Sequence, residues 1–334
     1  MSRTVSPLHL LVEDPSHTSD ARRQVVGLAR SMGFSEGDQG RVALAVTEIC
    51  TNLLKHAGRG QMIVRRLEPA AGIEILALDA GGGMGDLPLS MTDGYSTAGS
   101  AGEGLGAIER VSTLFEVWTR SGLGTALVCR VQPGPAPASR LETGSVCLAR
   151  AGESQCGDAI AVRAAGGRVH VLVVDGLGHG PDAAAAAAAA VKVFHEDTWE
   201  TPLHGMELMH GALHGTRGAA AGLATVDIDG GVVTFCGAGN VEAVVLHGDE
   251  SRHLISQNGT VGRQVRTLRE YTESWAQSDL LVMHSDGLRS RWRLDAYPGL
   301  RQRHPALIAG MLFRDFTRGY DDLSVMVARA VHPG

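Results

Sequence analysis

The chain has 334 residues, of which 44% are hydrophobic and 20% are charged, and its formal net charge is -6. This composition is that of a soluble globular protein long enough for two domains, and without a basic run it excludes the nucleic-acid-binding classes. No apolar run reaches the roughly 20 residues that span a bilayer, and the five cysteines show no C-x-x-C pair. We therefore expect a cytoplasmic protein with reduced thiols and no membrane partner.

The first part of the chain alternates strand-like and helix-like segments. The expected order is strand, two helices, two strands, a helix and two strands, over residues 9–13, 19–32, 35–57, 61–68, 72–79, 106–115, 115–119 and 124–131. Ser35 and Asp38 form an S-x-x-D start signal for the second helix. This order predicts helices layered on one face of a mixed sheet.

A proline-rich stretch from Gln132 to Arg140 separates the two halves, because proline continues neither a helix nor a central strand. We therefore expect an α/β (α+β) two-domain protein, with domains at residues 1–131 and 142–334 and a linker at 132–141. In the second half we expect strands at 169–175, 222–229, 231–239, 242–248, 279–287 and 322–330, and helices over 183–190, 206–214 and 305–316. This pattern predicts two sheets with helices packed outside them.

The second helix carries a candidate chemical face. Glu48, Asn52 and His56 recur every four residues and share one side, next to an apolar side formed by Val42, Val46, Ile49 and Leu53. An asparagine can hold Mg²⁺ through its carbonyl while a glutamate orients or deprotonates a hydroxyl. For this helix alone, a solvated polar stripe is the alternative.

Two glycine-rich stretches follow. Asp79 ends a strand and precedes AGGGM, where an acidic side chain can accept a hydrogen bond from an adenine amino group. The stretch DGYSTAGSAGEGLGAIERV, residues 93–111, runs into a helix but lacks the P-loop lysine. By itself it can be a phosphate cradle, a hinge or a mobile loop.

Together these motifs resemble the GHKL ATPase fold. They are E-x-x-x-N, D-x-G-x-G, G-x-G-x-G and a late Gly124-Thr125 pair, and DGYST followed by GLG resembles the RsbT branch of small switch serine kinases, over residues 10–131. The resemblance implies an α/β sandwich that binds ATP and Mg²⁺, with residues 93–111 as the ATP lid. It implies that Glu48 is the general base, Asn52 the Mg²⁺ ligand and Asp79 the adenine reader. The implied nucleotide-binding set is Asn52, Asp79, Gly81, Gly83, Gly102, Gly104, Gly106 and Thr125.

Aspartates dominate the polar positions of the second half. Asp175 ends a strand and enters DGLGHG, and further aspartates stand at Asp158, Asp286, Asp321 and Asp322. A buried cluster of carboxylates is costly unless cations neutralise it, and an all-oxygen set suits Mg²⁺ or Mn²⁺. Two such ions can share a water and direct it at phosphorus. Ordinary turn aspartates are the alternative. His179, inside DGLGHG, either touches substrate phosphate or supports its loop.

The order GD, DGLGHG, GAGN, SDG and DD-x-S-V resembles the SpoIIE/RsbX branch of metal-dependent serine/threonine phosphatases, over residues 142–331. The resemblance implies a β-sandwich flanked by helices that holds two Mn²⁺ or Mg²⁺ ions. Asp175 would be catalytic and bridge both ions with help from the Gly176 carbonyl. Asp158, Asp286 and Asp321 would complete the ligand set, with Asp321 preferred over Asp322.

The two resemblances imply a bifunctional switch protein that phosphorylates and dephosphorylates serine or threonine on a partner. The implied partner is a STAS-domain anti-sigma-factor antagonist or a stressosome-type protein, in a bacterial sigma-factor or stress-signalling pathway. The alternative is a phosphatase whose first domain senses ATP, or sequesters a sigma factor or downstream regulator, without kinase activity.

Overall fold

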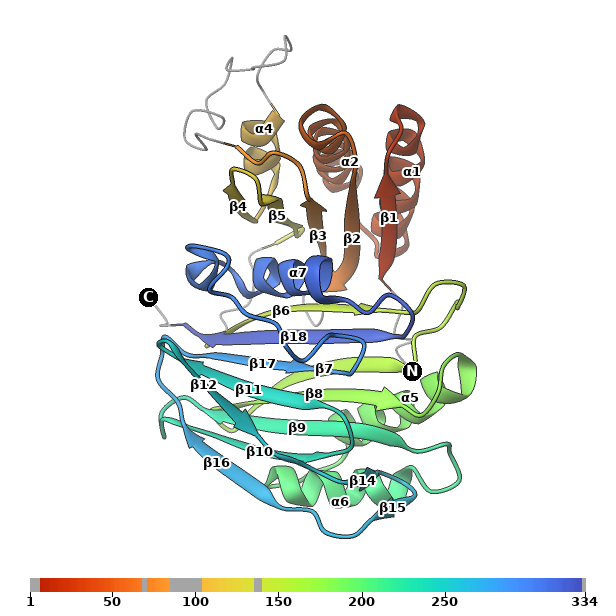
Figure 1. Ribbon diagram of the computed structural model, residues 1–334. Helices are drawn as coiled ribbons and strands as arrows, with labels where there is room; N and C mark the ends of the chain where they lie inside the picture. The colour runs from red at the N-terminus through yellow and green to blue at the C-terminus, as the bar shows by residue number, and fades with distance from the viewer. Residues whose placement is uncertain (1–6, 68–70, 85–103, 135–139, 332–334) are drawn as a thin grey trace. The chain divides into compact units, whose positions relative to one another are not determined.

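The computed structural model describes residues 7–67, 71–84, 104–134 and 140–331. The chain forms two compact units (Figure 1). The first comprises Met1–Ala138 together with Leu294–Met311, and the second comprises Ser139–Arg293 together with Leu312–Gly334. A short stretch from the C-terminal half of the sequence therefore belongs to the first unit.

The first unit contains a five-stranded sheet in the order β1-β2-β3-β5-β4. Its strands are β1 (Leu8–Val12), β2 (Gly60–Leu67), β3 (Gly72–Asp79), β4 (Leu114–Arg120) and β5 (Gly124–Val131), and its helices are α1 (Pro15–Ser31), α2 (Glu36–Asn52), the π-helical turn η1 (Leu53–Ala57) and α4 (Gly104–Val111). Every pairing in this sheet is antiparallel.

The expectation of a mixed sheet in this unit is wrong. Two helices lie between β1 and β2, so the chain reverses direction before it enters the neighbouring strand. The strands β3 and β4 run in the same direction, because both are antiparallel to β5, but β5 lies between them and so they do not pair with each other. The predicted order of strands and helices is confirmed.

Both faces of this sheet are buried. One face packs on α1, α2 and α4 around Val25, Val46, Ile49, Ile75 and Leu127. On the other face, the Trp118 indole Nε1 donates a 3.1 Å hydrogen bond to the Pro298 carbonyl. The residues of Leu294–Met311 thus cover apolar side chains such as Leu76 and Leu78, each worth about 1.5–3 kcal/mol when buried.

Local signals set the helix boundaries. Helix α1 begins four residues before the expected start, because Asp14 caps it by accepting from the Ser16 amide at 2.8 Å and Pro15 occupies its first turn. Helix α2 begins as predicted, with the Ser35 hydroxyl accepting from the Asp38 amide at 3.1 Å. After Asn52 the helix widens into the π-helical turn η1, a distortion that is frequent at functional sites.

The second unit is built on two sheets. One has the order β13-β10-β9-β8-β7 with β16 also paired to β10, the other has the order β12-β11-β17-β18-β6, and β14 pairs with β15 separately. The strands are β6 (Leu141–Leu148), β7 (Asp158–Ala165), β8 (Arg168–Gly176), β9 (Ala219–Asp227), β10 (Val232–Ala238), β11 (Glu242–His247), β12 (Glu250–Leu254), β13 (Ser256–Gln257), β14 (Gly259–Thr260), β15 (Gln264–Val265), β16 (Glu270–Ser274), β17 (Leu280–His284) and β18 (Leu323–Ala330).

The helical elements of the C-terminal half are α5 (Pro181–Glu196), α6 (Pro202–Ala212), the 3-10 turn η2 (Leu300–Gln302) and α7 (Pro305–Phe316). One core joins the two sheets through residues such as Val173, Phe235 and Met283. A second core joins α5 and α6 to the β7–β10 sheet, with Ala187 and Met206 among its members. The expected pair of sheets with outer helices is confirmed. No helix in the described part of the chain has the length and apolar character needed to cross a membrane.

Candidate active sites

The first candidate site lies where α2 meets the start of α4. The predicted apolar face of α2 is buried through Val42, Val46 and Ile49, which leaves Glu48 and Asn52 half-buried on a neighbouring side. A Cβ placed on Gly104 would lie 3.0 Å from Asn52 Oδ1 and 3.5 Å from Glu48 Oε2. The structure therefore brings Glu48, Asn52 and Gly104 together, as the sequence predicts.

The Asn52 side chain has a feature typical of a ligand-binding group. Its Nδ2 atom is buried and has no hydrogen-bond partner within the described residues, although an unpaired buried amide costs about 1–3 kcal/mol. An amide and a carboxylate together offer the oxygen atoms that Mg²⁺ prefers. These residues fit a magnesium nucleotide.

Asp79 organises the first glycine motif at the end of β3. Its Oδ1 atom accepts hydrogen bonds from the Gly81 amide at 2.8 Å and the Thr125 amide at 3.2 Å. Gly83 has a φ of 69° and its Cβ would fall 2.1 Å from the Arg120 carbonyl, so only glycine fits there. The structure thus joins Asp79, Gly81, Gly83 and Thr125 in one loop cluster.

The second glycine motif is described in part. Gly104 and Gly106 lie in α4, with Gly106 buried. Gly102 and most of the expected ATP lid, residues 93–103, lie outside the described residues.

The second candidate site begins with Asp158 and Asp175, which stand directly opposite each other on the adjacent strands β7 and β8. Asp158 is buried, and its Oδ2 atom has no hydrogen-bond partner among the residues described. Gly176 ends β8 and donates its amide to the Gly157 carbonyl at 2.9 Å, which ties the two strand ends together. A carboxyl oxygen in this position needs a cation or a proton.

Electrostatic repulsion links the four predicted carboxylates. Burial first, and then the charges of Asp158, Asp286 and Asp321, raise the pKa of Asp175. Burial and the charges of Asp322 and Asp286 also raise the pKa of Asp158, and the hydrogen bonds of Ser285 and Ser324 oppose this rise. Burial and the charge of Asp286 raise the pKa of Asp321. The structure therefore gathers Asp158, Asp175, Asp286 and Asp321 into one cluster that a cation would stabilise.

The four carboxylates do not form a preorganised metal site. Within the described residues, no three His, Cys, Asp or Glu side chains are already arranged to hold a metal ion. The donor set is all oxygen, which fits Mg²⁺ or Mn²⁺.

The adjacent aspartates 321 and 322 differ in what they contact. Both carboxyl oxygens of Asp322 accept backbone hydrogen bonds at 2.8 Å, from the amides of Arg150 and Gly157. Asp321 is partly exposed, and its Oδ1 accepts a hydrogen bond from the Asp322 amide at 3.0 Å. Asp322 therefore holds the Gly157 loop in place, and this supports Asp321 as the ligand of the pair.

Sequence reasoning assigned no role to Asn240, which lies in the GAGN motif. Its Nδ2 atom donates a 2.6 Å hydrogen bond to Asp286 Oδ2 and so orients that carboxylate. Its place in a motif that carries metal ligands was the signal that could have identified it. His179 Nδ1 lies 2.7 Å from Glu153 Oε1, a contact that supports its loop.

Both parts of the chain match known protein families. Residues 11–131 match the family described as histidine kinase-like ATPase domain. The first part of the chain is 33% identical over 109 residues to the serine/threonine-protein kinase RsbT of Bacillus subtilis (strain 168), covering 32% of this chain and 82% of RsbT. The chain belongs to the RsbT family.

Residues 165–330 match the family described as stage II sporulation protein E. The phosphoserine phosphatase RsbX of Bacillus subtilis (strain 168) is 27% identical over 143 residues, which cover 42% of this chain and 71% of RsbX. The crystal structure of RsbX in complex with magnesium superposes with a TM-score of 0.51 and 22% identity, covering 59% of this chain and 98% of that one.

A chain from a structure of the bacterial stressosome superposes with a TM-score of 0.54 and 31% identity, covering 57% of this chain and all of that one. The RsbT relative therefore carries an ATPase domain homologous to a serine/threonine kinase, joined to a SpoIIE-type domain homologous to metal-dependent PP2C-type phosphatases. This fusion supports a role in regulation by partner switching.

Proposed function

We propose that this RsbT relative is a bifunctional cytoplasmic switch protein. Its first domain, at residues 1–131, transfers phosphate from ATP to a serine or threonine of a partner, and its second, at residues 142–334, removes it. A linker at 132–141 joins them. The partner is a STAS-type anti-sigma-factor antagonist or a stressosome-type protein, and the output is control of a sigma factor or a stress-signalling pathway. Homology to both a kinase and a phosphatase supports the proposal.

One observation gives the main support for the proposed phosphatase activity. Asp158 and Asp175 face each other across β7 and β8, deep enough that their repulsion makes the cluster dependent on a counter-charge. A structural role would have left the Asp158 oxygen paired, as Asp322 is paired with two amides. The cluster is therefore better suited to binding cations than to holding the fold together.

In the kinase site, two side chains of α2, Glu48 and Asn52, have different roles. Glu48 accepts the proton of the partner's hydroxyl as the oxygen of that hydroxyl bonds to the γ-phosphorus and the bond to the β-phosphate oxygen breaks. Asn52 holds Mg²⁺, which when bound neutralises the phosphate charge. Asp79 reads the adenine, while Gly81, Gly83, Gly104 and Gly106 let the backbone approach the nucleotide.

In the phosphatase site, Asp175 and the Gly176 carbonyl would hold two cations together with Asp158, Asp286 and Asp321. Two Mn²⁺ or Mg²⁺ ions, when bound, supply Lewis acidity and an activated water. Asn240 keeps Asp286 oriented through its 2.6 Å hydrogen bond. Asp322 fixes the Gly157 loop that carries Asp158.

The phosphatase half is tested by phosphate release from a phosphoserine peptide with Mn²⁺, using Asp175→Asn. We expect a loss of at least about 100-fold, because the metal positions lose their shared charge. Asp249→Asn, at an exposed turn, is the matched control and should retain full activity. An Asp175→Asn protein as active as wild type would contradict the assignment.

The kinase half is tested by comparing ATP binding and phosphate transfer in Glu48→Gln. We expect Mg²⁺–ATP binding within a few-fold of wild type and a loss of transfer of about 100-fold, the range for one general base. Glu109→Gln, on the exposed side of α4, is the control. Wild-type ATP binding without any transfer would instead indicate an ATP-sensing or sequestering module.

A further inference from the structure

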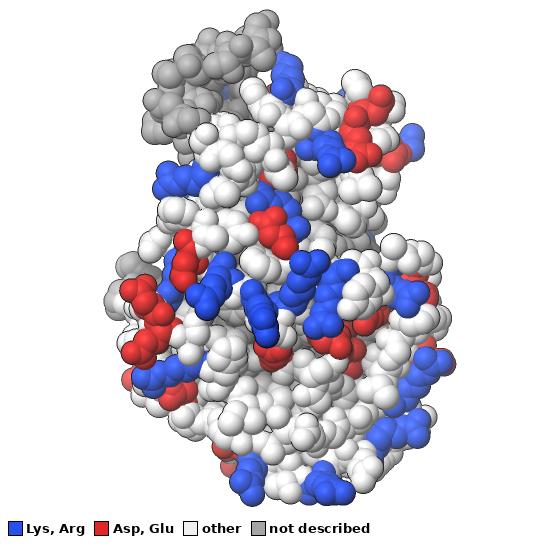
Figure 2. Space-filling view, viewed as in Figure 1, with Lys and Arg blue, Asp and Glu red and all other residues white. Residues whose placement is uncertain are grey.

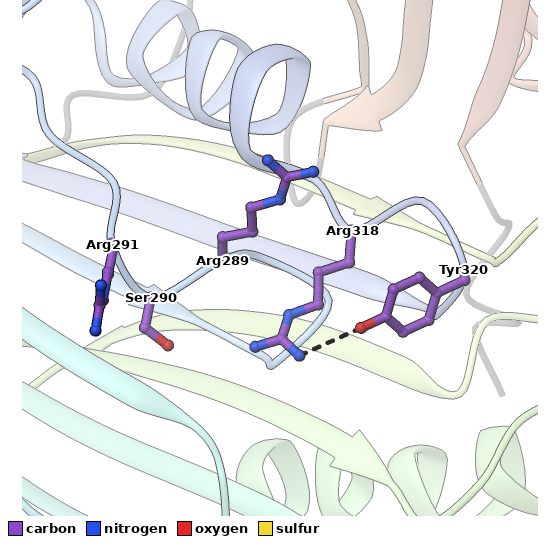
Figure 3. Close-up of a pocket in the computed structure, with 5 residues that line it drawn as sticks. All are labelled: Arg289, Ser290, Arg291, Arg318 and Tyr320. Atoms are coloured by element: carbon purple, nitrogen blue, oxygen red, sulfur yellow. Dashed lines mark hydrogen bonds between the residues drawn. The ribbon is translucent and has the colours of Figure 1, made fainter.

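A surface pocket with an unusual concentration of positive charge lies in the second unit. It is lined by Arg289, Ser290, Arg291, Arg318 and Tyr320 and has a volume of about 460 Å³. Figure 3 shows Ser290 and Arg291 at one side of the opening, Arg318 and Tyr320 at the other, and Arg289 between them. Figure 2 shows positive side chains gathered on the face that carries these loops. The mechanism above uses none of these residues.

The backbone of the pocket is continuous with the carboxylate cluster. The loop after Asp286 and the loop before Asp321 are joined by two 2.9 Å backbone hydrogen bonds, from the Arg289 amide to the Phe316 carbonyl and from the Arg318 amide to the Gly287 carbonyl. A Cβ on Gly287 would lie 2.0 Å from the Asp322 carbonyl, so the two loops are closely packed. The pocket is therefore fixed beside the candidate metal ligands.

The arginine side chains of the pocket are exposed and have few polar partners among the described residues. Within the described residues, neither Arg289, Arg291 nor Arg318 forms an ion pair at hydrogen-bonding distance, and Arg318 donates only a 3.4 Å hydrogen bond to the Tyr320 hydroxyl. The negative charges of Asp286 and Asp321 attract the Arg318 guanidinium. When those carboxylates bind cations, they no longer balance the positive charge of Arg318. Three like charges in one pocket then favour an anion from outside.

We propose that Arg289, Arg291 and Arg318 bind an acidic group that flanks the phosphorylated residue of the protein substrate. This rests on the phosphatase function proposed above and names the substrate class of that site. The shared chemistry of the flanking group is an oxyanion, either an Asp or Glu carboxylate or a second phosphate. Guanidinium groups bind both through charge-assisted, often bidentate, hydrogen bonds.

The arrangement favours a flanking group over the phosphate that is removed. Asp158 and Asp175, where that phosphate must react, do not line the pocket. The five lining side chains are all exposed, whereas Asp158 is buried. The three arginine side chains are spread out and point in different directions (Figure 3), which suits an extended acidic segment better than a single phosphate.

Steady-state hydrolysis with four substrates separates these roles. Three are phosphoserine peptides of the same core, with an acidic flank, a second phosphoserine or a neutral flank, and the fourth is p-nitrophenyl phosphate. In the triple variant R289Q/R291Q/R318Q we expect kcat/KM to fall about 10- to 100-fold for the acidic or doubly phosphorylated peptide, a size consistent with losing charge-assisted hydrogen bonds. The kcat/KM of the triple variant should change less than about twofold for the neutral peptide and for p-nitrophenyl phosphate. Arg266→Gln, at an exposed arginine elsewhere in the unit, should leave kcat/KM unchanged for all four substrates.

The peptide that responds identifies the flanking group. An equal fall for all four substrates would mean that the arginines act on the transferred phosphate, and no fall for any would mean that they bind no substrate. Either result overturns the proposal.

Direct binding separates this proposal from the phosphatase function. Fluorescence anisotropy with an unphosphorylated acidic peptide and full-length wild-type protein, with Mn²⁺ present, should show salt-sensitive binding that the triple variant lacks and Arg266→Gln retains. If wild type hydrolyses nothing yet binds this peptide through the three arginines, the phosphatase function fails and the subsite stands. If wild type hydrolyses phosphopeptides but the triple variant and Arg266→Gln bind the acidic peptide equally well, the proposed subsite is wrong and the phosphatase function is retained.

Discussion

Glu74 is a buried charged residue of the first unit. Its carboxylate accepts from Arg65 Nε at 2.6 Å and from Arg130 Nε at 2.8 Å, across three neighbouring strands. Burial alone would raise the pKa of Glu74, but the two guanidinium charges outweigh it and lower the pKa from 4.5 to about 2. The ionised carboxylate is therefore the form that the fold stabilises.

The magnitude follows from that difference. Roughly 2.5 pKa units at 1.36 kcal/mol each correspond to about 3 kcal/mol of folding free energy. Because the folded pKa is depressed, this contribution is present above the unfolded pKa of 4.5 and is lost as the pH falls towards about 2. Removing one partner of a buried pair costs about 3–5 kcal/mol. We expect the lower end, since Arg65 and Arg130 are 23% and 21% exposed and can regain water.

The assay is urea unfolding of Glu74→Gln, read by hydrogen exchange of β2, β3 and β5 so that the first unit is followed separately. We expect a loss of about 3 kcal/mol at pH 7 that shrinks between pH 4.5 and pH 2, with Glu109→Gln within about 0.5 kcal/mol of wild type. A loss below 1 kcal/mol, or one that is the same at pH 3 and pH 7, would refute the reasoning.

Two further predictions concern the second unit. Burial and neighbouring carboxylates raise the folded pKa of Asp158 above its unfolded value, so ionised Asp158 lowers the stability of the folded unit as the pH rises. Asp158→Asn should therefore raise the melting temperature of the metal-free unit at pH 8, and it should abolish any gain in melting temperature on adding Mn²⁺. An unchanged response to Mn²⁺ would contradict the role of Asp158 as a ligand. Gly287→Ala should lose phosphatase activity and about 1–3 kcal/mol of stability, because its Cβ would meet the Asp322 backbone at 2.0 Å. Gly211→Ala, whose Cβ meets nothing within 4 Å, is the control in calorimetry and should be neutral or stabilising.

Features of local periodicity were predictable from the sequence. The four-residue spacing of Glu48 and Asn52 places both on one side of α2, whichever tertiary structure surrounds it. The Ser35 cap was likewise visible as S-x-x-D, whereas the start of α1 was misjudged because the Asp14-Pro15 signal was not used. In the first unit the order of strands and helices followed from the same local patterns, whereas the strands β6, β7 and β12 to β16 of the second unit were not predicted.

Features that depend on long-range pairing were not predictable. The sheet of the first unit was expected to be mixed, but strand direction depends on which strands become neighbours, and β5 inserts between β3 and β4. The register that sets Asp158 opposite Asp175 joins positions on different strands. Nothing in the sequence around Pro298 shows that it will accept a hydrogen bond from Trp118.

The candidate sites show the same division. Motif order predicted Asp158, Asp175, Asp286 and Asp321 as a group, because the residue types are those that the chemistry of cation binding requires. The choice between Asp321 and Asp322 gains support only from the structure, where backbone amides occupy both oxygens of Asp322. The arginine pocket combines residues 289–291 with residues 318 and 320, so no single stretch of the sequence predicts it.

The central claim is that one chain adds and removes the same phosphate. The most direct test incubates candidate STAS-domain partners from the same genome with γ-labelled ATP, Mg²⁺ and the Asp175→Asn protein, and then adds wild-type protein with Mn²⁺. The account predicts label on a serine or threonine of one partner and its removal by the wild type. Absence of label while ATP binding is intact would contradict it, leaving the first unit as a nucleotide-binding module and the phosphatase as the only enzyme.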